Sequence, residues 1–227
     1  MRHLHILCEG QTEEIIAREV LEPHFSAPDI RVSWSIFTTS RPAGGPAFKG
    51  GLSRWPKVER ELRRLLRDSS TTVLTTMFDY YAFPSGAPGM ADRPHGAPND
   101  RVTHVESALA KAIDDRRFLP NLVLHEIETW VLADCARLGQ VMGDHAPAAE
   151  LERIVQHRSG PELVNEGVNT APSKRIMNAY PQYVKVVDGP LVIADASLGS
   201  IRNSCPHADS WLREIEARLR TTPPPPR

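Results

Sequence analysis

The sequence predicts an α/β fold with a mostly parallel sheet, followed by a helical C-terminal half. In residues 1–128, short alternating or β-branched apolar runs take turns with amphipathic helical segments, which is the order typical of a parallel sheet. From residue 129 onward the segments are helical, short and interrupted by prolines. The two patterns together predict a sheet with helices packed on it and further helices beyond it.

Alternating or β-branched apolar residues predict four strands, at residues 3–8, 30–36, 71–78 and 122–124. Amphipathic spacing predicts helices between Thr12 and Pro23, at residues 55–68 and at residues 100–115. Thr12 is a favourable residue type for the N-cap of the first of these helices.

Two long segments rich in Gly and Pro, residues 38–54 and 84–99, interrupt this pattern. Loops of this length inside a compact domain are more often functional than structural filler. The sequence therefore predicts an α/β core over residues 1–135 that carries both loops, a helical extension packed on it over residues 136–220, and a disordered tail over residues 221–227.

Size and composition are those of a soluble globular protein. The chain has 227 residues, of which 41% are hydrophobic and 24% charged, and its formal net charge is −1. The near-zero charge argues against a protein that coats nucleic acid through excess Lys and Arg. There is no run of 18 apolar residues to span a membrane, and the first ten residues do not resemble a signal peptide. Three widely separated cysteines without a CxxC pair predict free thiols in a reducing cytoplasm.

Acidic residues follow three of the predicted strands. Glu9 follows the first strand, Asp79 follows the third, and Glu126 and Glu128 follow the fourth, while Glu13 lies just after Glu9. Because ligands of an open parallel sheet bind at the carboxyl ends of its strands, these side chains are expected to meet at one edge. Carboxylates at close range repel unless a cation joins them or their pKa values rise. Oxygen ligands suit a hard ion, so the sequence predicts a Mg²⁺ or Mn²⁺ site.

Each of these acids also has a simpler interpretation. Glu13 and Glu14 suit the positive end of a helix dipole, and Asp79 suits the start of a turn. Glu126 and Glu128 suit the exposed first turn of a helix. A shared metal site is the interpretation that accounts for all of the positions at once.

The same residues carry a resemblance to a known family. The stretch "ILCEGQTEE" resembles the first strand motif of Toprim domains, the metal-binding fold of topoisomerases, primases and overcoming-lysogenization-defect nucleases. Along almost its whole length the chain resembles the DUF4276 family within that superfamily. The stretches that carry this resemblance, in chain order, are "CEGQTEE", "KGG", "TTMFDYYAFP", "RFLPNLVLHEIETWVLAD", "TAPSKRI" and "SIRNSCPHADSWL".

The resemblance implies a Toprim-like three-layer core that uses Mg²⁺ to cut or transfer phosphodiesters. By position, Glu9 matches the Toprim glutamate, Glu13 the second glutamate of the nuclease branch, and Asp79 the first Asp of the DxD motif. The second Asp of that motif corresponds to Tyr81. Either Glu126 or Glu128 then supplies the missing carboxylate, or the site holds one metal, or it is not catalytic. The resemblance also implies an ABC-type ATPase partner in a phage-defence module.

The leading hypothesis is therefore a divalent-metal-dependent nuclease of DNA or RNA. Glu9, Asp79 and Glu126 would serve the reaction, with Glu13 and Glu128 as further metal ligands. The basic residues Lys174 and Arg175 would neutralise phosphate charge, and Lys49 and Arg54 would contact the nucleic-acid backbone, although a plain surface role stays open for all four. His125 is either a general base or a hydrogen-bonded structural residue.

Two other classes stay open. One is an adaptor subunit that keeps a Toprim shape but binds a partner ATPase, which the near-neutral charge and Tyr81 favour. The other is a small-molecule phosphotransferase or hydrolase at the same sheet edge. No Walker-type Lys motif is present, so ATP hydrolysis by this chain itself is not expected. A homo-oligomer is compatible with the sequence.

Overall fold

A computed structural model gives the arrangement of the chain and describes residues 1–40, 48–49, 54–164 and 170–221, with only the backbone described at 38–40 and 48–49. The strands are β1 (Arg2–Cys8), β2 (Ile30–Ile36), β3 (Thr38–Ser40), β4 (Phe48–Lys49), β5 (Val73–Asp79), β6 (Phe118–Leu119) and β7 (Leu122–Val123). The helices are α1 (Gln11–Ile16), α2 (Glu22–Phe25), α3 (Trp55–Leu65), α4 (Pro98–Ile113), α5 (Glu128–Val131), α6 (Cys135–Met142), α7 (His145–His157), α8 (Pro172–Ala179), α9 (Asp188–Ser204) and α10 (Pro206–Thr221).

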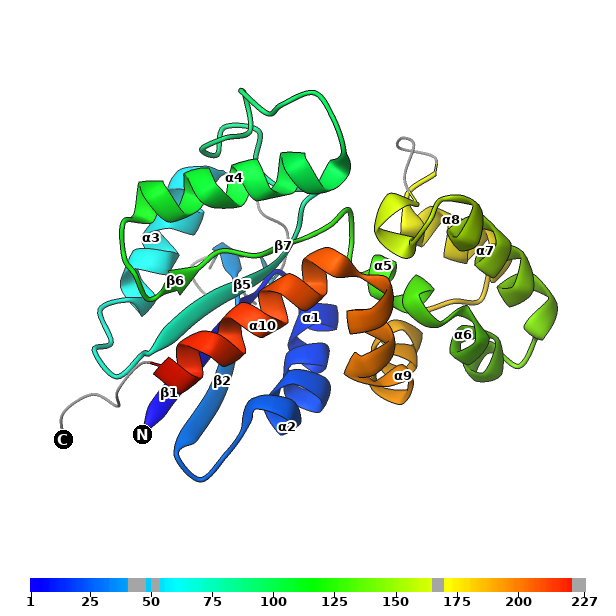
Figure 1. The fold of residues 1–227 in the computed structure, drawn as a ribbon, viewed down its shortest axis with the longest axis horizontal. Coiled ribbons are helices and arrows are strands. Elements are labelled where there is room, and N and C mark those ends of the chain that lie inside the picture. The colour runs from blue at the N-terminus through cyan, green and yellow to red at the C-terminus, as the bar shows by residue number, and fades with distance from the viewer. Residues whose placement is uncertain (41–47, 50–53, 165–169, 222–227) are drawn as a thin grey trace.

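The main sheet is parallel throughout and has the order β2-β1-β5-β6, with β7 also paired to β5 (Figure 1). The predicted α/β class, with its mostly parallel sheet and its helical C-terminal half, is confirmed. The central strands β1 and β5 are buried along most of their length, which explains why they are apolar or β-branched on both faces.

The edge of the sheet beside β5 is one strand broken into two pieces. Pro120 separates β6 from β7 and has no backbone N–H to offer the ladder. Asn121 keeps this edge bound to β5 through two hydrogen bonds to Thr76. Its backbone N–H donates to the Thr76 hydroxyl at 3.0 Å, and its side-chain Nδ2 donates to the Thr76 carbonyl at 3.0 Å. After β7 the chain enters the turn that carries His125 and Glu126.

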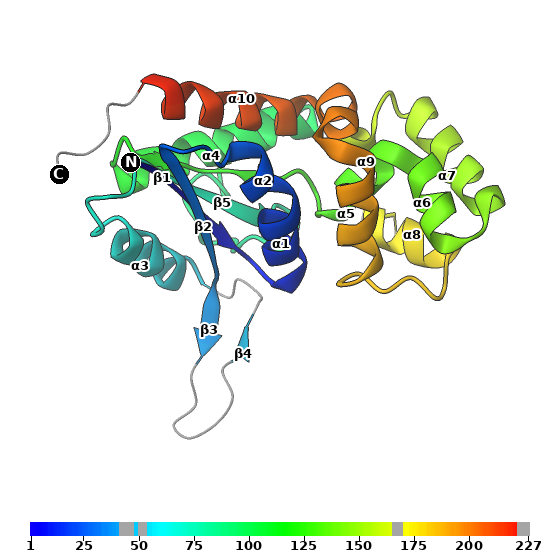
Figure 2. The same cartoon turned by 90° about the horizontal axis from the view of Figure 1, so that it is seen from below.

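Helices cover both faces of the sheet and form three layers with it (Figure 2). One face presents Leu4, Ile6 and Met77 to a core that includes α1 and α10. The other face presents Leu7, Leu74 and Phe78 to the apolar sides of α3 and α4. The alternation of the strands thus supplies two separate hydrophobic cores.

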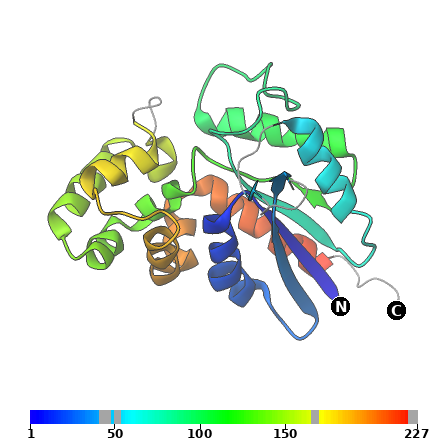
Figure 3. The same ribbon diagram turned by 180° about the vertical axis from the view of Figure 1, so that it is seen from behind.

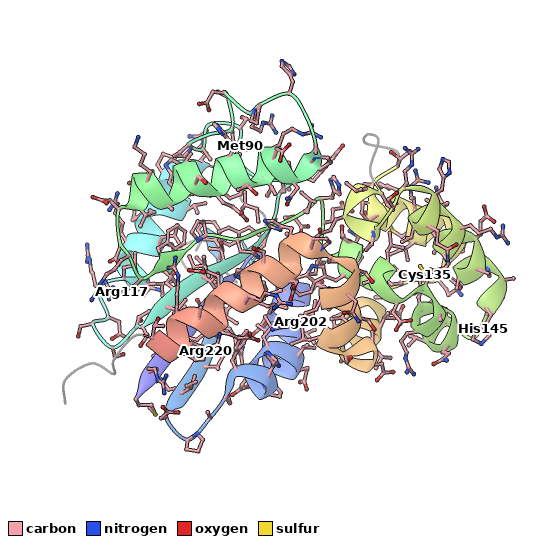
Figure 4. The ribbon with its side chains drawn as sticks, in the orientation of Figure 1. Met90, Arg117, Cys135, His145, Arg202 and Arg220 are labelled. Carbon is pink, nitrogen blue, oxygen red and sulfur yellow. The ribbon has the colours of Figure 1, made fainter. Side chains whose placement is uncertain are left out.

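The helices α5 to α9 form a lobe beside the carboxyl ends of the strands, and α10 then returns along the sheet next to β1 and β5 (Figures 1 and 3). The core of this lobe is continuous with the one under α10. Arg202 on α9 pairs with Asp209 and Glu216 of α10 and so ties the lobe to the helix on the sheet (Figure 4). The first helix of this half, α5, packs against α8 and α9.

The first helix begins earlier than the sequence predicts. Gly10 is its N-cap, so the assignment of Thr12 to that position is wrong. The side chain of Glu13 accepts a hydrogen bond from the Gly10 N–H at 2.8 Å, which satisfies a donor that the helix start would otherwise expose. A π-helical turn, Ala17–Leu21, joins α1 to α2 in one continuous helix.

The structure describes the second predicted loop in full and the first only in part. Within residues 38–54, the backbones of β3 and β4 pair antiparallel. Residues 84–97 are irregular but anchored, since Ala87 and Met90 are buried against α4 in the second core. Most of the predicted tail lies outside the described residues, although Thr221 ends α10. None of the described helices has the length and apolar character that crossing a membrane requires.

Candidate functional site

The carboxyl ends of β1 and β5 bring Glu9 and Asp79 together. Cys8 is paired with Met77, and the Glu9 N–H continues the ladder by donating to the Met77 carbonyl at 3.0 Å. The Asp79 N–H in turn donates to Glu9 Oε2 at 3.0 Å. The two acids therefore sit on adjacent strands at the sheet edge where the sequence placed them.

Asp79 also holds the turn after β7. Its Oδ1 accepts a hydrogen bond from the Ile127 N–H at 2.9 Å, between the two acids of that turn. Glu126 extends toward the lobe, where its Oε2 accepts from the Ser173 N–H in the first turn of α8 at 3.0 Å. Glu128 is the first residue of α5 and is only 2% exposed. The site thus joins the sheet to α5 and α8.

The close approach of these carboxylates perturbs their pKa values. Burial, followed by the negative charges of Glu9 and Glu128, raises the pKa of Glu13 from 4.5 to about 7, although backbone hydrogen bonds act in the opposite direction. Burial, followed by the charges of all four other carboxylates, holds the pKa of Asp79 well above its usual value. Glu9, Glu13, Asp79, Glu126 and Glu128 will be called the carboxylate cluster. Without a cation, the raised pKa of Glu13 lies close to neutral pH.

Two residues of the cluster's surroundings were not foreseen from the sequence. Lys185 places its Nζ 3.1 Å from Glu128 Oε1. Partial burial acts to lower the pKa of Lys185, but the negative charges of Glu128 and Glu126 outweigh it and raise that pKa. Tyr183 is buried, and burial followed by the charge of Glu128 raises its pKa. Both lie in the stretch "PQYVKVV", where the only sequence signal is a single Lys among valines.

The cluster fits a hard divalent cation in its donor chemistry, with Glu9, Glu13, Asp79 and Glu128 as the residues that would hold one. Glu128 Oε2 supports this, since it is buried and has no hydrogen-bond partner among the described atoms. The side chains are not yet arranged for coordination. Within the described part of the chain, no three His, Cys, Asp or Glu residues form a group that could hold a metal ion as they stand.

The comparisons with known proteins identify the family. Residues 8–216 match the family model described as "Domain of unknown function (DUF4276)". The chain belongs to the DUF4276 family. The comparisons with curated proteins and with solved structures gave no match. The segment that matches the DUF4276 model contains the whole carboxylate cluster together with Tyr183 and Lys185.

His125 has a structural environment in this DUF4276 protein. It is buried with a φ of 69°, and its Nε2 lies 2.9 Å from the backbone carbonyl of Glu162, which can only accept a hydrogen bond. That nitrogen is therefore a donor and not a base. The backbone carbonyl of His125 accepts a hydrogen bond from the N–H of Tyr81, and Tyr81 is 42% exposed. The residue two positions after Asp79 thus presents a phenol at the surface instead of a carboxylate.

The four basic residues predicted to contact phosphate groups lie in different parts of the chain. Lys174 is exposed and follows Ser173, whose N–H contacts the cluster. Arg175 is partly buried and donates to the Thr170 carbonyl at 3.0 Å. Arg54 is exposed at the start of α3, and the side chain of Lys49 lies outside the described residues. Of these four, Lys174 has the clearest relation to the cluster, because it shares its helical turn with Ser173.

Proposed function

We propose that this DUF4276 protein is a divalent-metal-dependent nuclease with a Toprim-like core. One observation supports the proposal above all: five carboxylates from β1, α1, β5, the turn after β7 and α5 gather at the carboxyl edge of a parallel sheet. Burial, and after it the charges of the neighbouring carboxylates, raises the pKa values of Glu13 and Asp79, and a bound cation would offset both effects.

The residues have distinct tasks in this proposal. A bound Mg²⁺ or Mn²⁺ would supply an activated water and stabilise negative charge on phosphate oxygens. Glu9 and Asp79 would hold the ion, since they are on adjacent strands, with Glu13 and one acid of the 126–128 turn completing the set. Asp79 also orients that turn through the Ile127 N–H. Lys174 would neutralise a phosphate beside the cluster, and Arg54, Arg175 and Lys49 would contact the nucleic-acid backbone farther away.

The cellular setting is part of the proposal. Cys8, Cys135 and Cys205 are free and buried, which agrees with a reducing cytoplasm. The resemblance to nucleases that work with ATPases supports an ABC-type ATPase partner and a role in phage defence.

Metal binding and cleavage test the proposal together. Calorimetric titration of the chelator-treated chain with Mn²⁺ is expected to show saturable binding that Glu9→Gln and Asp79→Asn each abolish. Glu14→Gln is the matched control, because Glu14 lies on the same helical turn but only partly buried. Labelled single- and double-stranded DNA and RNA, incubated with Mn²⁺ and the chain, are expected to be cut by the wild type and by Glu14→Gln only. Binding and cleavage that persist in Asp79→Asn would refute the assignment.

A second function is an adaptor subunit without catalysis. Its specific support is that four of the acids already accept hydrogen bonds from backbone N–H groups and Glu128 pairs with Lys185, while Tyr81 takes the place of the second Asp. An adaptor would show no Mg²⁺ or Mn²⁺ binding at millimolar concentration and would still bind its ATPase partner. The nuclease proposal requires the opposite result in the titration.

A further inference from the structure

The two carboxylate oxygens of Glu128 have different surroundings. Its carboxylate is almost completely buried, yet only Oε1 has a cation beside it, and Oε2 has no hydrogen-bond partner among the described atoms. The hydroxyl of Tyr183, whose pKa the Glu128 charge raises, is also buried and also lacks a partner there. The buried Oε2 of Glu128 is therefore an acceptor left open among the described atoms, as a ligand of the cluster would require.

Lys185 reaches this place from the surface. It lies in the turn before α9, and its side chain is 41% exposed. Its sequence neighbours Val184, Val186 and Val187 are exposed apolar residues, so this turn lies at the surface. The turn itself is fixed, because the Val184 N–H donates to Asp188 Oδ2 at 2.7 Å. The amine can therefore move while its backbone stays in place.

The amine and a divalent cation make the same interaction. Each neutralises the buried carboxylate of Glu128, and each is attracted by the other acids of the cluster. Two cations beside one carboxylate repel strongly in a partly buried site. Simultaneous contact of both with Glu128 is therefore unfavourable.

We propose that Lys185 is a tethered counter-ion of the carboxylate cluster, and that its amine leaves Glu128 when a divalent cation binds there. The inference rests on the proposed metal site and adds how that site is controlled. The chain carries its own competitor for the metal, which keeps Glu128 neutralised in the metal-free protein. Access of metal to Glu128 then depends on where the Lys185 amine lies, while the turn that carries it stays in place.

Metal affinity tests the competition. Lys185→Met removes the amine and keeps an unbranched side chain, and Lys111→Met on the exposed face of α4 is the matched control. Titration with Mn²⁺ is expected to give binding about tenfold tighter for Lys185→Met than for wild type, which is the typical effect of losing one charge-assisted hydrogen bond. Lys111→Met is expected to bind as the wild type does. Lys185→Gln provides a second variant if Lys185→Met fails to fold.

Equal or weaker Mn²⁺ binding by both Lys185 variants would overturn the counter-ion role and leave the metal site standing. No binding by the wild type, with binding by Lys185→Met, would support the competition in its strongest form. No binding by any of these proteins would overturn the metal site itself, so the two failures are distinguishable.

Chemical labelling tests the same step without a variant. A short pulse of an amine-acetylating reagent, followed by peptide mass spectrometry, reports how available each Lys amine is. Saturating Mn²⁺ is expected to raise labelling of Lys185 several-fold, because the amine is released from its ion pair, and to leave Lys111 unchanged. Labelling of Lys185 that stays constant across a Mn²⁺ titration that saturates the protein would show that the amine remains on Glu128.

Discussion

Replacing Glu13 by Gln isolates one ionisation within the carboxylate cluster. Glu13 is 6% exposed and accepts the Gly10 N–H through Oε2. A glutamine keeps the size of the side chain and an oxygen that accepts this hydrogen bond, but it cannot ionise. Any change in the pH dependence of stability then comes from the charge of Glu13 and from its effect on the acids coupled to it, such as Asp79.

The sign and size of the effect follow from the pKa. The folded protein raises the pKa of Glu13 from 4.5 to about 7, mainly because the side chain is buried. The folded state therefore binds this proton more tightly than the unfolded chain does. The resulting stabilisation is complete below pH 4.5 and is lost as the pH rises through 7. The shift corresponds to about 3 kcal/mol in the free energy of unfolding.

Urea unfolding in a chelating buffer, repeated between pH 4.5 and 8, measures this difference. Wild type and Glu14→Gln are expected to lose about 3 kcal/mol more than Glu13→Gln over this range. Burial lowers the pKa values of His3, His5 and His125, which makes stability rise with pH over the acidic part of the range. That contribution is common to the three proteins and cancels in the comparison. Parallel curves for wild type and Glu13→Gln would refute the reasoning.

Three further substitutions test the scaffold of the site. Trp211→Phe removes the indole N–H that donates to Thr75 Oγ1 at 2.8 Å. The free energy of unfolding measured in urea is expected to fall by about 1–3 kcal/mol, and an unchanged urea midpoint would contradict this. Asn121→Ala removes the donor to the Thr76 carbonyl, and a loss of about 1–3 kcal/mol is expected in the same assay, with near-neutral behaviour as the contrary result. Glu162→Gln places an amide group against the two N–H groups that begin α10, so hydrogen exchange measured by mass spectrometry is expected to accelerate in the first turn of α10 and not in α7.

The local patterns of the sequence were sufficient for β1, β2, β5 and β7 and for the acids that follow β1, β5 and β7. Alternation in residues 3–8 and 30–36 and the β-branched run at 71–78 correspond to β1, β2 and β5, because period and burial are local properties of a strand. The position of Glu9 and Asp79 at one sheet edge then followed from the rule that parallel strands end together.

The remaining features depend on contacts between distant parts of the chain. Thr12 is a favourable N-cap residue type, but Gly10 takes that position because the strand ends there and Glu13 satisfies its N–H. The short strand β6 was not predicted, because Pro120 separates it from the apolar run that forms β7. Lys185 could not be assigned, because only the packing of α9 against α1 and α5 brings its turn to Glu128.

The return of α10 along the sheet has a consequence for how the protein is made. Trp211 bonds to Thr75 in β5, and Arg2 at the start of β1 donates to the Leu219 carbonyl near the end of α10. One face of the earliest strand is therefore covered by a helix that the ribosome releases after every strand of the sheet. The nascent sheet must wait, with Leu4, Ile6 and Met77 only partly covered, until α10 has emerged. Folding is expected to be slow, since its closing contacts join residues far apart in sequence.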